Sequence, residues 1–366
     1  MNQNLVVHFG KYSKIKHGGV ETVLRGFVNT KKFKHQFICY GKDTEIELFD
    51  ETKCNINFSF LKQPFSYMYI KFLFEYLYIK KAIIILHMPN LQLLVMFRLL
   101  ALFSNRKIII FWHADPYSGK TALLNFLQKR LLFLAIGKKI RIITTSQLYK
   151  AGSDFLLEIP NDFLDVCTLC IPESTDIILE RYAVNKKKSL QEKNVHVLAV
   201  GRLVKYKNFE ELIRSFVDLD ECYVLNLVGD GPLKKNLSNL IYRLGLEHRV
   251  KILGSLPQDE LIKEYRKADI FCLPSNTRAE AFGIVLIEAI AANLPIVING
   301  CLKSGTIDIA NIYPYSFKFN SKYPLSLTET LEKARNCVVE QDMCKKIYIE
   351  NFSIEKFNKI FSSILE

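Results

Sequence analysis

Residues 195–299 alternate between short apolar runs and longer segments of helical periodicity, and this alternation constrains the fold more than any other feature. The apolar runs lie at 195–201, 222–229, 250–255, 269–275 and 294–299, and the helical segments at 208–218, 233–245, 258–268 and 283–293. Runs that are apolar on both faces are typical of parallel strands buried beneath helices. The pattern therefore predicts a doubly wound α/β domain.

The first half of the chain shows a similar, less regular alternation. Strand-like runs lie at 4–10, 35–41, 82–88, 107–115 and 140–146, with a helical pattern at 19–29. A length of 366 residues is typical of two average domains. A hydrophobic content of 49% supplies two cores and argues against general disorder. We therefore predict two doubly wound α/β domains of similar size, joined by the polar, lysine-rich segment 178–195 and facing each other across a cleft.

The most apolar long segment, residues 82–103, raises the alternative of a membrane span. Its apolar residues are interrupted by His87, Pro89, Asn90 and Arg98, whereas a span needs about 20 predominantly apolar residues. We favour a buried strand followed by a helix. The first residues of the chain also lack the basic, apolar and cleavage segments, in that order, that export needs, so we expect a cytosolic protein.

The nine cysteines have scattered spacings, and their odd number argues against a full disulfide framework. Cys167 and Cys170 form the only C-x-x-C pair. One such pair has too few ligands for structural zinc and lacks the strand-turn-helix setting of a redox motif. We predict two partly buried thiols.

A formal net charge of +13 favours an anionic partner. Nucleic acid, acidic lipid headgroups and phosphorylated small molecules all fit this charge, so the choice depends on the residues that follow the predicted strands.

Ligands of doubly wound sheets bind beyond the carboxyl ends of the strands, and several loops there have suitable residues. Gly18 and Gly19 precede the first predicted helix, where backbone N–H groups can approach a phosphate, although such a pair is also common for conformational reasons alone. Arg202 and Lys207 follow the first strand of the second half, where two cations can clamp a diphosphate or form a solvated basic turn. The turn 229–231 either lets backbone approach a planar base or caps the next helix.

Glu280 and Glu288 lie on either side of the start of an otherwise apolar helix. Glu280 precedes it, and Phe282 and Gly283 begin it, so that the amides and the positive end of the helix dipole point to one place. Glu288 has apolar neighbours on its own helix face, and a buried carboxylate is unfavourable unless it is hydrogen-bonded. A ribose diol would supply two donors, whereas the alternative places Glu288 on a solvent-exposed face.

Segments 200–208 (VGRLVKYKN), 227–233 (LVGDGPL) and 280–297 (EAFGIVLIEAIAANLPIV) resemble, in order and spacing, the donor half of retaining glycosyltransferases of the GT4 family, which have the GT-B architecture. In the first half, GGVETVL resembles the same family, and IIIFWHADPYSGK resembles bacterial enzymes that build O-antigen, capsule and other lipid-linked glycans. The resemblance implies an acceptor domain at 1–175 and a nucleotide-sugar domain at 176–349. It also implies a C-terminal helix, at about 350–366, that packs back on the first domain.

The resemblance implies a role for each residue of the donor half. Arg202 and Lys207 would hold the diphosphate and offset the charge of the leaving group. Glu288 would bind the ribose hydroxyls. Glu280 would bind the transferred sugar near its 3-hydroxyl, with help from the amides of Ala281, Phe282 and Gly283.

Further implied contacts come from both halves. The backbone of Leu256 would contact the base, and Gly18 and Gly19 would close over the diphosphate. His113 would lie by the reactive face of the sugar. The family usually continues beyond residue 300 with a glycine-rich turn and an acidic residue, of which this chain keeps only Ser304 and Gly305.

The implied reaction is retaining transfer without a protein nucleophile, in which the acceptor attacks the face that the diphosphate leaves. No second carboxylate is suited to a covalent intermediate. Asp218 and Asp220 match an Asp-x-Asp metal motif, but they follow a predicted helix and precede a strand, at the wrong end of the sheet for ligand binding. We therefore expect no metal requirement and no other cofactor.

The WHAD segment favours GDP-mannose as donor, with a UDP-sugar as close second, and a glycan or polyprenyl-diphosphate-linked acceptor. Segments 64–82 and 120–141 combine basic and aromatic residues at roughly helical spacing, as core-facing helices with basic outer faces do and as helices that bind anionic lipid also do. We favour peripheral binding at the inner face of a bacterial inner membrane. The rival functions are another GT-B enzyme, such as a sugar-nucleotide epimerase or a phosphorylase, and a nucleic-acid-binding protein, which would leave Glu280 and Glu288 unexplained.

Overall fold

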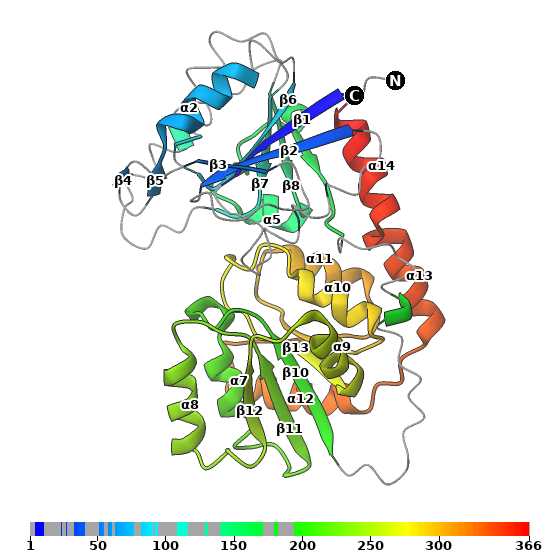
Figure 1. Cartoon of the computed structure of the whole chain (residues 1–366). Helices are drawn as coiled ribbons and strands as arrows, with labels where there is room; N and C mark the ends of the chain where they lie inside the picture. The colour runs from blue at the N-terminus through cyan, green and yellow to red at the C-terminus, as the bar shows by residue number, and fades with distance from the viewer. Residues whose placement is uncertain are drawn as a thin grey trace. The chain divides into compact units, whose positions relative to one another are not determined.

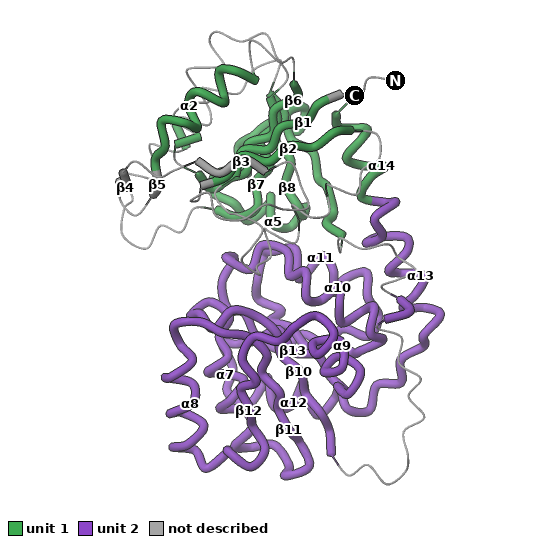
Figure 2. Tube along the Cα trace, in the orientation of Figure 1, with its two compact units in different colours: residues 1–172, 357–366 green, residues 173–356 purple. Residues whose placement is uncertain are grey.

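The computed structural model describes residues 4–10, 23, 27, 33–40, 51–54, 58–60, 63–76, 82–90, 92–93, 108–115, 129–130, 140–170, 179–181 and 194–365. The chain divides into two compact units (Figure 2). Unit 1 contains residues 1–172 and 357–366, and unit 2 contains residues 173–356. Each unit is an α/β structure built on its own sheet, as the sequence predicts, and the two are described separately.

Unit 1 has a seven-stranded sheet in the order β3-β2-β1-β6-β7-β8-β9, with every neighbouring pair parallel (Figure 1). Its strands are β1 (Asn4–Phe9), β2 (Phe33–Tyr40), β3 (Glu51–Cys54), β6 (Ile83–Met88), β7 (Ile108–Trp112), β8 (Ile140–Thr144) and β9 (Leu164–Val166). A separate antiparallel pair consists of β4 (Phe58–Phe60) and β5 (Gln63–Phe65). The described helices are α2 (Tyr67–Phe74), α5 (Gln147–Gly152), the 3-10 turn η2 (Asn161–Phe163) and, from residue 357 onward, α14 (Ile354–Leu365). The five predicted strands are confirmed, whereas β3 and β9 were not predicted.

Helical residues cover both faces of this sheet. Successive side chains of a strand point to opposite faces. Phe9 of β1 contacts Tyr69 of α2, with ring centroids 5.5 Å apart, whereas His8 contacts Phe27 at 4.9 Å. Phe27 in turn packs against Phe361 of α14 at 4.6 Å. The first sheet is thus buried beneath helical residues on both sides, as its apolar runs predict.

Unit 2 has a six-stranded parallel sheet in the order β12-β11-β10-β13-β14-β15 (Figure 1). The strands are β10 (Val195–Val200), β11 (Tyr223–Val228), β12 (Val250–Gly254), β13 (Ile270–Leu273), β14 (Ile296–Asn299) and β15 (Ser316–Phe319). The helices are η3 (Lys205–Lys207), α7 (Phe209–Ser215), α8 (Lys234–Arg243), α9 (Gln258–Lys267), α10 (Ile284–Ala291), α11 (Gly305–Ile312), α12 (Ser326–Arg335) and α13 (Gln341–Phe352). Numbered along the chain, the strand order is 3-2-1-4-5-6, the order of the Rossmann fold. All nine elements predicted between 195 and 299 are confirmed, and α11, β15, α12 and α13 extend the pattern.

The two faces of this second sheet also pack against different helices. Val197 and Ala199 of β10 belong to one buried cluster with the apolar residues of α7, α8 and α12. On the other face, Phe271 of β13 stacks on Tyr265 of α9, with ring centroids 5.6 Å apart. Burial on both faces is what distinguishes a doubly wound sheet from a half-exposed one.

Two interpretations of the apolar and cysteine-containing segments can be compared with this fold. Residues 83–88 form β6, a buried strand, as predicted, and most of the helix expected after it lies outside the described residues. In the described ranges, none of the helices combines the length and apolar character required to cross a bilayer. Cys167 and Cys170 are buried thiols that are not joined in a disulfide, and burial raises the pKa of Cys167 far above its ordinary value.

Candidate active site

The candidate site of unit 2 lies where its chain connections change direction. Strands β10 and β13 are neighbours at the middle of the sheet. The connections from β10 lead towards β12, and those from β13 lead towards β15, so a crevice is expected beyond the carboxyl ends of this pair. The loops that follow the two strands, residues 201–207 and 274–283, carry most of the residues that the sequence predicts for the donor.

Lys207 and Glu280 are brought into direct contact from these two loops. The turn η3 directs Lys207 inward, and the side chains are nearly buried, with residue exposures of 7% and 8%. Lys207 Nζ lies 2.5 Å from Glu280 Oε2. A Cβ atom at Gly201 would lie 3.1 Å from Nζ, so glycine at this position leaves room for the ammonium group. The pair satisfies two charges that are otherwise expensive to bury.

The electrostatic surroundings favour the charged form of Lys207. Burial acts most strongly and lowers the pKa of Lys207, but Glu280 and Tyr206 together with Glu288 outweigh it, and the pKa of the ammonium group is raised above its ordinary value. Ser275, which is buried, donates a 3.0 Å hydrogen bond to Oε2 of Glu280. The ammonium group of Lys207 is therefore a fixed cation beyond the carboxyl ends of β10 and β13.

Glu288 lies on α10 and is partly buried. Its Oε2 atom accepts a 2.7 Å hydrogen bond from the hydroxyl of Tyr265 on α9. Burial raises the pKa of the Glu288 carboxyl to about 7, against the opposing effects of the Tyr265 hydrogen bond and the Lys207 charge. Glu288 is therefore poised between its ionised and protonated forms near neutral pH.

The start of α10 presents unpaired donors next to Glu280. Gly283 is the N-cap of α10 and has a φ of 82°, a left-handed conformation that favours glycine. Within the part of the chain that the structure describes, the backbone N–H groups of Ala281, Phe282 and Gly283 have no acceptor. Such groups at a helix N-terminus can bind a hydroxyl or an anion.

The segment before α10 is held in place by the start of α11. The backbone N–H of Gly305 donates a 2.7 Å hydrogen bond to the carbonyl of Ala281. A Cβ atom at Gly305 would lie 2.8 Å from that carbonyl oxygen and from Phe282, which only glycine tolerates. The short Ser304–Gly305 turn therefore has a clear structural role beside the site.

Gly229 and Gly231 support the neighbouring loop. A Cβ atom at Gly229 would overlap the carbonyl oxygen of Gly201, and one at Gly231 would lie 2.6 Å from that of Leu203. The N-cap of α8 is Leu233, and the backbone N–H of Lys234, the first residue of this helix, donates to the carbonyl of Gly231 at 3.1 Å. These glycines allow backbone segments to pack closely around the loop that carries Lys207.

Arg202, Leu256 and the Gly18–Gly19 pair were also predicted to contact the nucleotide sugar. Arg202 is exposed, and its side chain has no hydrogen-bond or ion-pair partner in the described ranges. Leu256, after β12, is half-buried. Gly18 and Gly19 lie outside the described residues.

His113 belongs to unit 1, at the end of β7. It is 8% exposed, and its backbone N–H donates to the carbonyl of Met88 at 3.1 Å. The Trp112 indole and the Ser153 hydroxyl donate to Oδ1 of Asp115, at 3.0 and 2.7 Å, which fixes the WHAD loop. His113 Nε2 lies 2.8 Å from Nδ1 of His87. Burial lowers the pKa of His113 to about 3, so its ring is neutral at neutral pH.

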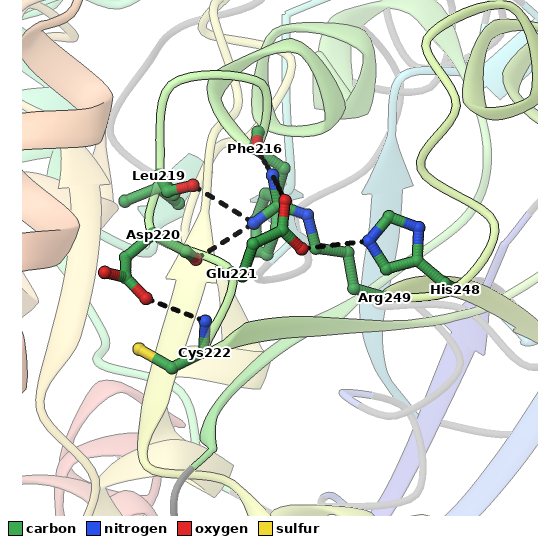
Figure 3. A network of polar contacts seen from close by, with 7 residues as sticks. All are labelled: Phe216, Leu219, Asp220, Glu221, Cys222, His248 and Arg249. Atoms are coloured by element: carbon green, nitrogen blue, oxygen red, sulfur yellow. Dashed lines mark hydrogen bonds and ion pairs between the residues drawn. The ribbon is translucent and has the colours of Figure 1, made fainter.

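Asp218 and Asp220 lie before β11, at the amino ends of the strands, as predicted. Figure 3 shows that Asp220 belongs to a structural network. Its Oδ1 atom accepts from the backbone N–H of Cys222 at 2.9 Å, and its carbonyl accepts from the buried guanidinium of Arg249 at 2.9 Å. Arg249 also donates to the carbonyls of Phe216 and Leu219. The Asp-x-Asp pattern thus belongs to the connection between α7 and β11.

Three residues that shape these sites were not predicted from the sequence. Ser275 and His87 each lie at or directly after a predicted strand, so the rule that selected Lys207 also applies to them. Tyr265 lies inside a predicted amphipathic helix, and its contact with Glu288 depends on how two helices pack. No local signal in the sequence identifies it.

Comparisons with known proteins agree with this geometry. Residues 181–305 match the sequence family described as Glycosyl transferases group 1. The match covers both loops of the site, from Arg202 to Gly305.

Several curated relatives match over part of their length. An uncharacterized glycosyltransferase of Methanocaldococcus jannaschii is 34% identical over 173 residues, which are 46% of this chain and 44% of the relative. The amylovoran biosynthesis glycosyltransferase AmsK of Erwinia amylovora is 34% identical over 110 residues, 28% of this chain and 27% of the relative. A GDP-mannose-dependent alpha-(1-6)-phosphatidylinositol monomannoside mannosyltransferase of Mycolicibacterium smegmatis is 33% identical over 109 residues, 28% of each chain. The chain thus matches less than half the length of these relatives.

Two solved structures share the fold over nearly the whole chain. Sucrose-phosphate synthase from Thermosynechococcus elongatus has a TM-score of 0.76 at 14% identity, covering 99% of this chain and 98% of the other. Anabaena Alr3699/HepE in complex with UDP has a TM-score of 0.71 at 15% identity and covers 99% of both chains. The fold of the chain is therefore the GT-B fold of glycosyltransferases, as predicted.

Proposed function

We propose that the protein is a retaining glycosyltransferase. It moves a hexose from a nucleotide-diphosphate sugar to a lipid-linked or other glycan acceptor in the synthesis of a surface polysaccharide such as O-antigen or capsule. The transfer uses no metal and no other cofactor.

The observation that carries the proposal is the cluster of Lys207, Glu280 and Glu288 beyond β10 and β13. Lys207 and Glu280 are in contact at 2.5 Å and nearly buried, and Glu288 acts on the charge of Lys207. A buried cation, a carboxylate and free helix amides match the charges and hydroxyls of a nucleotide sugar. A nucleic-acid-binding surface would not require any of these to be buried.

The residues have separate roles in the proposed reaction. The leaving diphosphate gains negative charge as the glycosidic bond breaks, and Lys207 and Arg202 stabilise that charge. Glu280 and the amides of Ala281 to Gly283 hold the sugar, and Glu288 accepts hydrogen bonds from the ribose. The acceptor hydroxyl attacks the face that the diphosphate leaves, which retains the configuration.

GDP-mannose is the favoured donor and a UDP-sugar the close second. The WHAD segment and the GDP-mannose-dependent relative support the first, and the UDP complex of a protein with the same fold supports the second. Amylovoran synthesis by another relative supports a polysaccharide product.

A thermal-shift panel of GDP-, UDP- and ADP-sugars, with and without EDTA, tests the donor site. A ligand that binds the folded state alone raises the melting temperature, so one nucleotide should raise it and EDTA should not change the result. Glu288→Ala and Lys207→Ala should each lose most of the shift, whereas Lys205→Ala, in the same turn but exposed, should keep it. A full shift in both site variants refutes the assignment.

The stereochemistry has its own test. Incubation of the protein with the stabilising donor and an acceptor glycan should give a product whose anomeric configuration, read by NMR, matches that of the donor sugar. An inverted product would refute retention, and interconversion of the donor into an epimer without transfer would identify an epimerase instead.

We also propose that unit 1 binds an anionic membrane at the cytoplasmic inner face. Helix α2 exposes Tyr67, Met68, Ile70 and Phe74, by 64, 40, 36 and 48%, and it has Lys71 in its last turn. Apolar and basic side chains on one surface helix are typical of binding at a lipid interface. In liposome flotation, acidic vesicles should carry the protein, and Tyr67→Ser with Phe74→Ser should release it. Tyr242→Ser, at a 74% exposed position of α8, is the matched control, and indifference to acidic lipid would end this proposal.

A further inference from the structure

Four histidine rings form a continuous row across the sheet of unit 1. His35 Nδ1 lies 2.8 Å from His8 Nε2, and His8 Nδ1 lies 3.0 Å from His87 Nε2. His87 Nδ1 lies 2.8 Å from His113 Nε2. The ring centroids are 5.1, 5.2 and 5.0 Å apart along this series. Each neighbouring pair is therefore within hydrogen-bond distance.

The register of the parallel strands explains the row. His8 is opposite Phe37 on one side and Ile85 on the other, so it shares a face with His35 and His87, each two residues from its partner. Likewise, Phe111 is opposite His87, and His113, the last ring of the row, lies two residues beyond Phe111. Each step moves to the next strand and two residues towards the carboxyl ends. The row thus runs diagonally from β2 to the WHAD loop.

Apolar rings surround the row and keep it neutral. Phe37 stacks on His8 at 4.6 Å, and Phe27 lies 4.9 Å from the same ring. Burial holds the pKa of His8 and of His87 well below its ordinary value. The pKa of His8 is lowered further by His35 and His87, and that of His87 by His113. For the rings of His8, His87 and His113, the described part of the chain offers no carboxylate partner.

Because each ring is neutral, all hydrogen bonds of the row must be donated in the same direction. A neutral imidazole has one N–H donor and one bare acceptor nitrogen. In one arrangement His113 donates to His87, His87 to His8 and His8 to His35, which leaves Nδ1 of His113 bare. In the other arrangement every donation is reversed, and Nδ1 of His113 carries a proton. The tautomer of each inner ring fixes that of its neighbours.

We propose that His113, His87, His8 and His35 form a proton relay that accepts the proton of the acceptor hydroxyl during glycosyl transfer. The relay rests on the proposed function together with the family resemblance, which implies that His113 lies by the reactive face of the transferred sugar. Transfer to a hydroxyl forms a new C–O bond and breaks the sugar–diphosphate bond, and the O–H proton must leave the hydroxyl. Nδ1 of His113 is the entry point of the relay.

Every proton is accounted for in the relay. As Nδ1 of His113 binds the hydroxyl proton, its Nε2 proton moves to His87, the Nε2 proton of His87 moves to His8, and that of His8 moves to His35. His35 then holds protons on both nitrogens and releases the Nε2 proton to solvent. The reverse shift, once the products have left, restores the first arrangement.

The row offers an advantage over a single buried base. His113 is 8% exposed, and an isolated imidazolium there is opposed by burial, which lowers its pKa to about 3. His35 is only half-buried, and its pKa is lowered less, to about 4. Moving the charge along three hydrogen bonds places it where water can stabilise it.

The hydrogen-bonded row can be tested without activity. The chain has seven histidines, so ¹⁵N-histidine labelling of the full-length protein gives a sparse spectrum. We expect N–N couplings across three hydrogen bonds in series and a single neutral tautomer for each of the four rings at pH 7. His8→Phe should abolish the two couplings at position 8 and leave His113 as a mixture of tautomers. Absence of the couplings in the unaltered protein overturns the relay.

Steady-state kinetics distinguishes a proton relay from a purely structural role of the histidine row. His8→Phe should lower kcat at least about tenfold, the lower range of proton-transfer catalysis, with an unchanged KM for the donor. His35→Phe, at the half-buried end, should also lower kcat and is least able to disturb the core. Phe37→Leu, which loosens the same stack but touches no ring nitrogen, is the matched control and should stay within about threefold.

The outcomes separate two kinds of failure. If both histidine variants keep kcat, or if Phe37→Leu lowers it as much as His8→Phe, the relay is overturned while glycosyl transfer stands. If no donor sugar is turned over at all, the proposed function fails, and the relay of an acceptor proton fails with it. The coupling spectrum then still reports whether the four rings are hydrogen-bonded in series.

Discussion

Both units bury polar side chains at the central strand pair of the sheet, in the loops after the strands in unit 2 and within the strands in unit 1, but they do so by opposite means. In unit 2, beside β10 and β13, Lys207 and Glu280 are buried as a charged pair at 2.5 Å. In unit 1, beside β1 and β6, His8 and His87 are buried as neutral rings at 3.0 Å. A buried charge requires a partner, whereas neutral donors and acceptors can be satisfied in a row.

The charged pair of unit 2 and the neutral row of unit 1 are suited to different steps of a reaction. A fixed charge is suited to stabilise a departing diphosphate but is poorly suited to take up and release a proton. A row of neutral imidazoles has the reverse properties. Substitutions in each region test whether charge pairing and neutral hydrogen bonding have these separate roles.

Removal of Lys207 should have the largest effect on stability. Lys207→Ala leaves the carboxylate of Glu280 buried without its cation, which typically destabilises a protein by about 3–5 kcal/mol. Lys205→Ala, in the same turn but exposed, should stay within about 0.5 kcal/mol. The midpoints of chemical denaturation measure both.

A double variant tests whether the instability comes from leaving one charge of the pair without its partner. Lys207→Met with Glu280→Gln removes both charges together and should recover most of the lost stability, but not nucleotide binding. If the single and double variants are equally unstable, pairing is not what holds this region together.

Removal of Arg249 should have the next largest effect. Its guanidinium donates to three backbone carbonyls at the amino ends of the strands (Figure 3). Arg249→Ala should destabilise the protein by about 2–3 kcal/mol, since hydrogen bonds to charged groups are among the stronger ones. The shift in melting temperature that the donor causes should persist. His248→Ala, which removes an exposed partner of Glu221, should have almost no effect on stability, and a lost donor shift in Arg249→Ala would show that this end of the sheet also serves binding.

The regular second half of the fold was predictable because its signals are local. Each strand between 195 and 299 is mostly apolar and each helix has at least one apolar face, so the elements and the doubly wound class follow from the chain alone. Strand β3 (Glu51–Cys54) is polar and short, and α11 follows a turn that departs from the family pattern. Neither carries the periodicity that reveals an element.

The candidate site was predictable only where strand ends mark it. Lys207 and Glu280 follow strands, and the sheet order makes those strands neighbours. Their direct contact was not foreseen, because it depends on the room at Gly201 and on how η3 directs the lysine. The histidine row was missed for a related reason. His8 and His87 look like isolated core residues until the strand register places them side by side.

The two regions should respond to acid in opposite directions. The pKa of each row histidine is lowered from 6.5, so the unfolded state binds more protons than the folded state as pH falls below 6.5. The row therefore loses stability on acidification, by up to about 1.4 kcal/mol per pH unit for each ring. The pKa of Glu288 is raised from 4.5 to about 7, so the folded state holds a proton that the unfolded state has lost, and this contribution falls as pH rises from 4.5 to 7.

Hydrogen exchange can separate these responses, because protection factors are read for each unit. Between pH 7 and 5.5, His87→Phe should flatten the loss of protection in β1 and β6. Glu288→Gln should change only the pH dependence of β10 and β13, in the opposite sense. Identical pH profiles in both units, in the unaltered protein and in the variants, would contradict the assigned titrations.

The smallest predicted effect concerns the contact between Tyr265 and Glu288. The Tyr265 hydroxyl donates to the carboxylate and favours its ionised form. Tyr265→Phe should therefore raise the pKa of Glu288 further above 7. At pH 7 nucleotide affinity should fall by up to about tenfold, the equivalent of one pKa unit, because a protonated carboxyl accepts fewer hydrogen bonds from a ribose.

Titration of nucleotide affinity from pH 6 to 9 distinguishes this effect from a general loss of packing. The variant should approach the affinity of the unaltered protein at high pH, where Glu288 is ionised in both. Tyr313→Phe is the matched control, since it removes a buried 2.8 Å hydrogen bond to the carbonyl of Leu294 in the same unit and should leave the pH midpoint unchanged. An unshifted midpoint in Tyr265→Phe would mean that the ionisation of Glu288 does not govern binding. The charges of unit 2 that govern nucleotide binding would then be those of Lys207 and Glu280 alone.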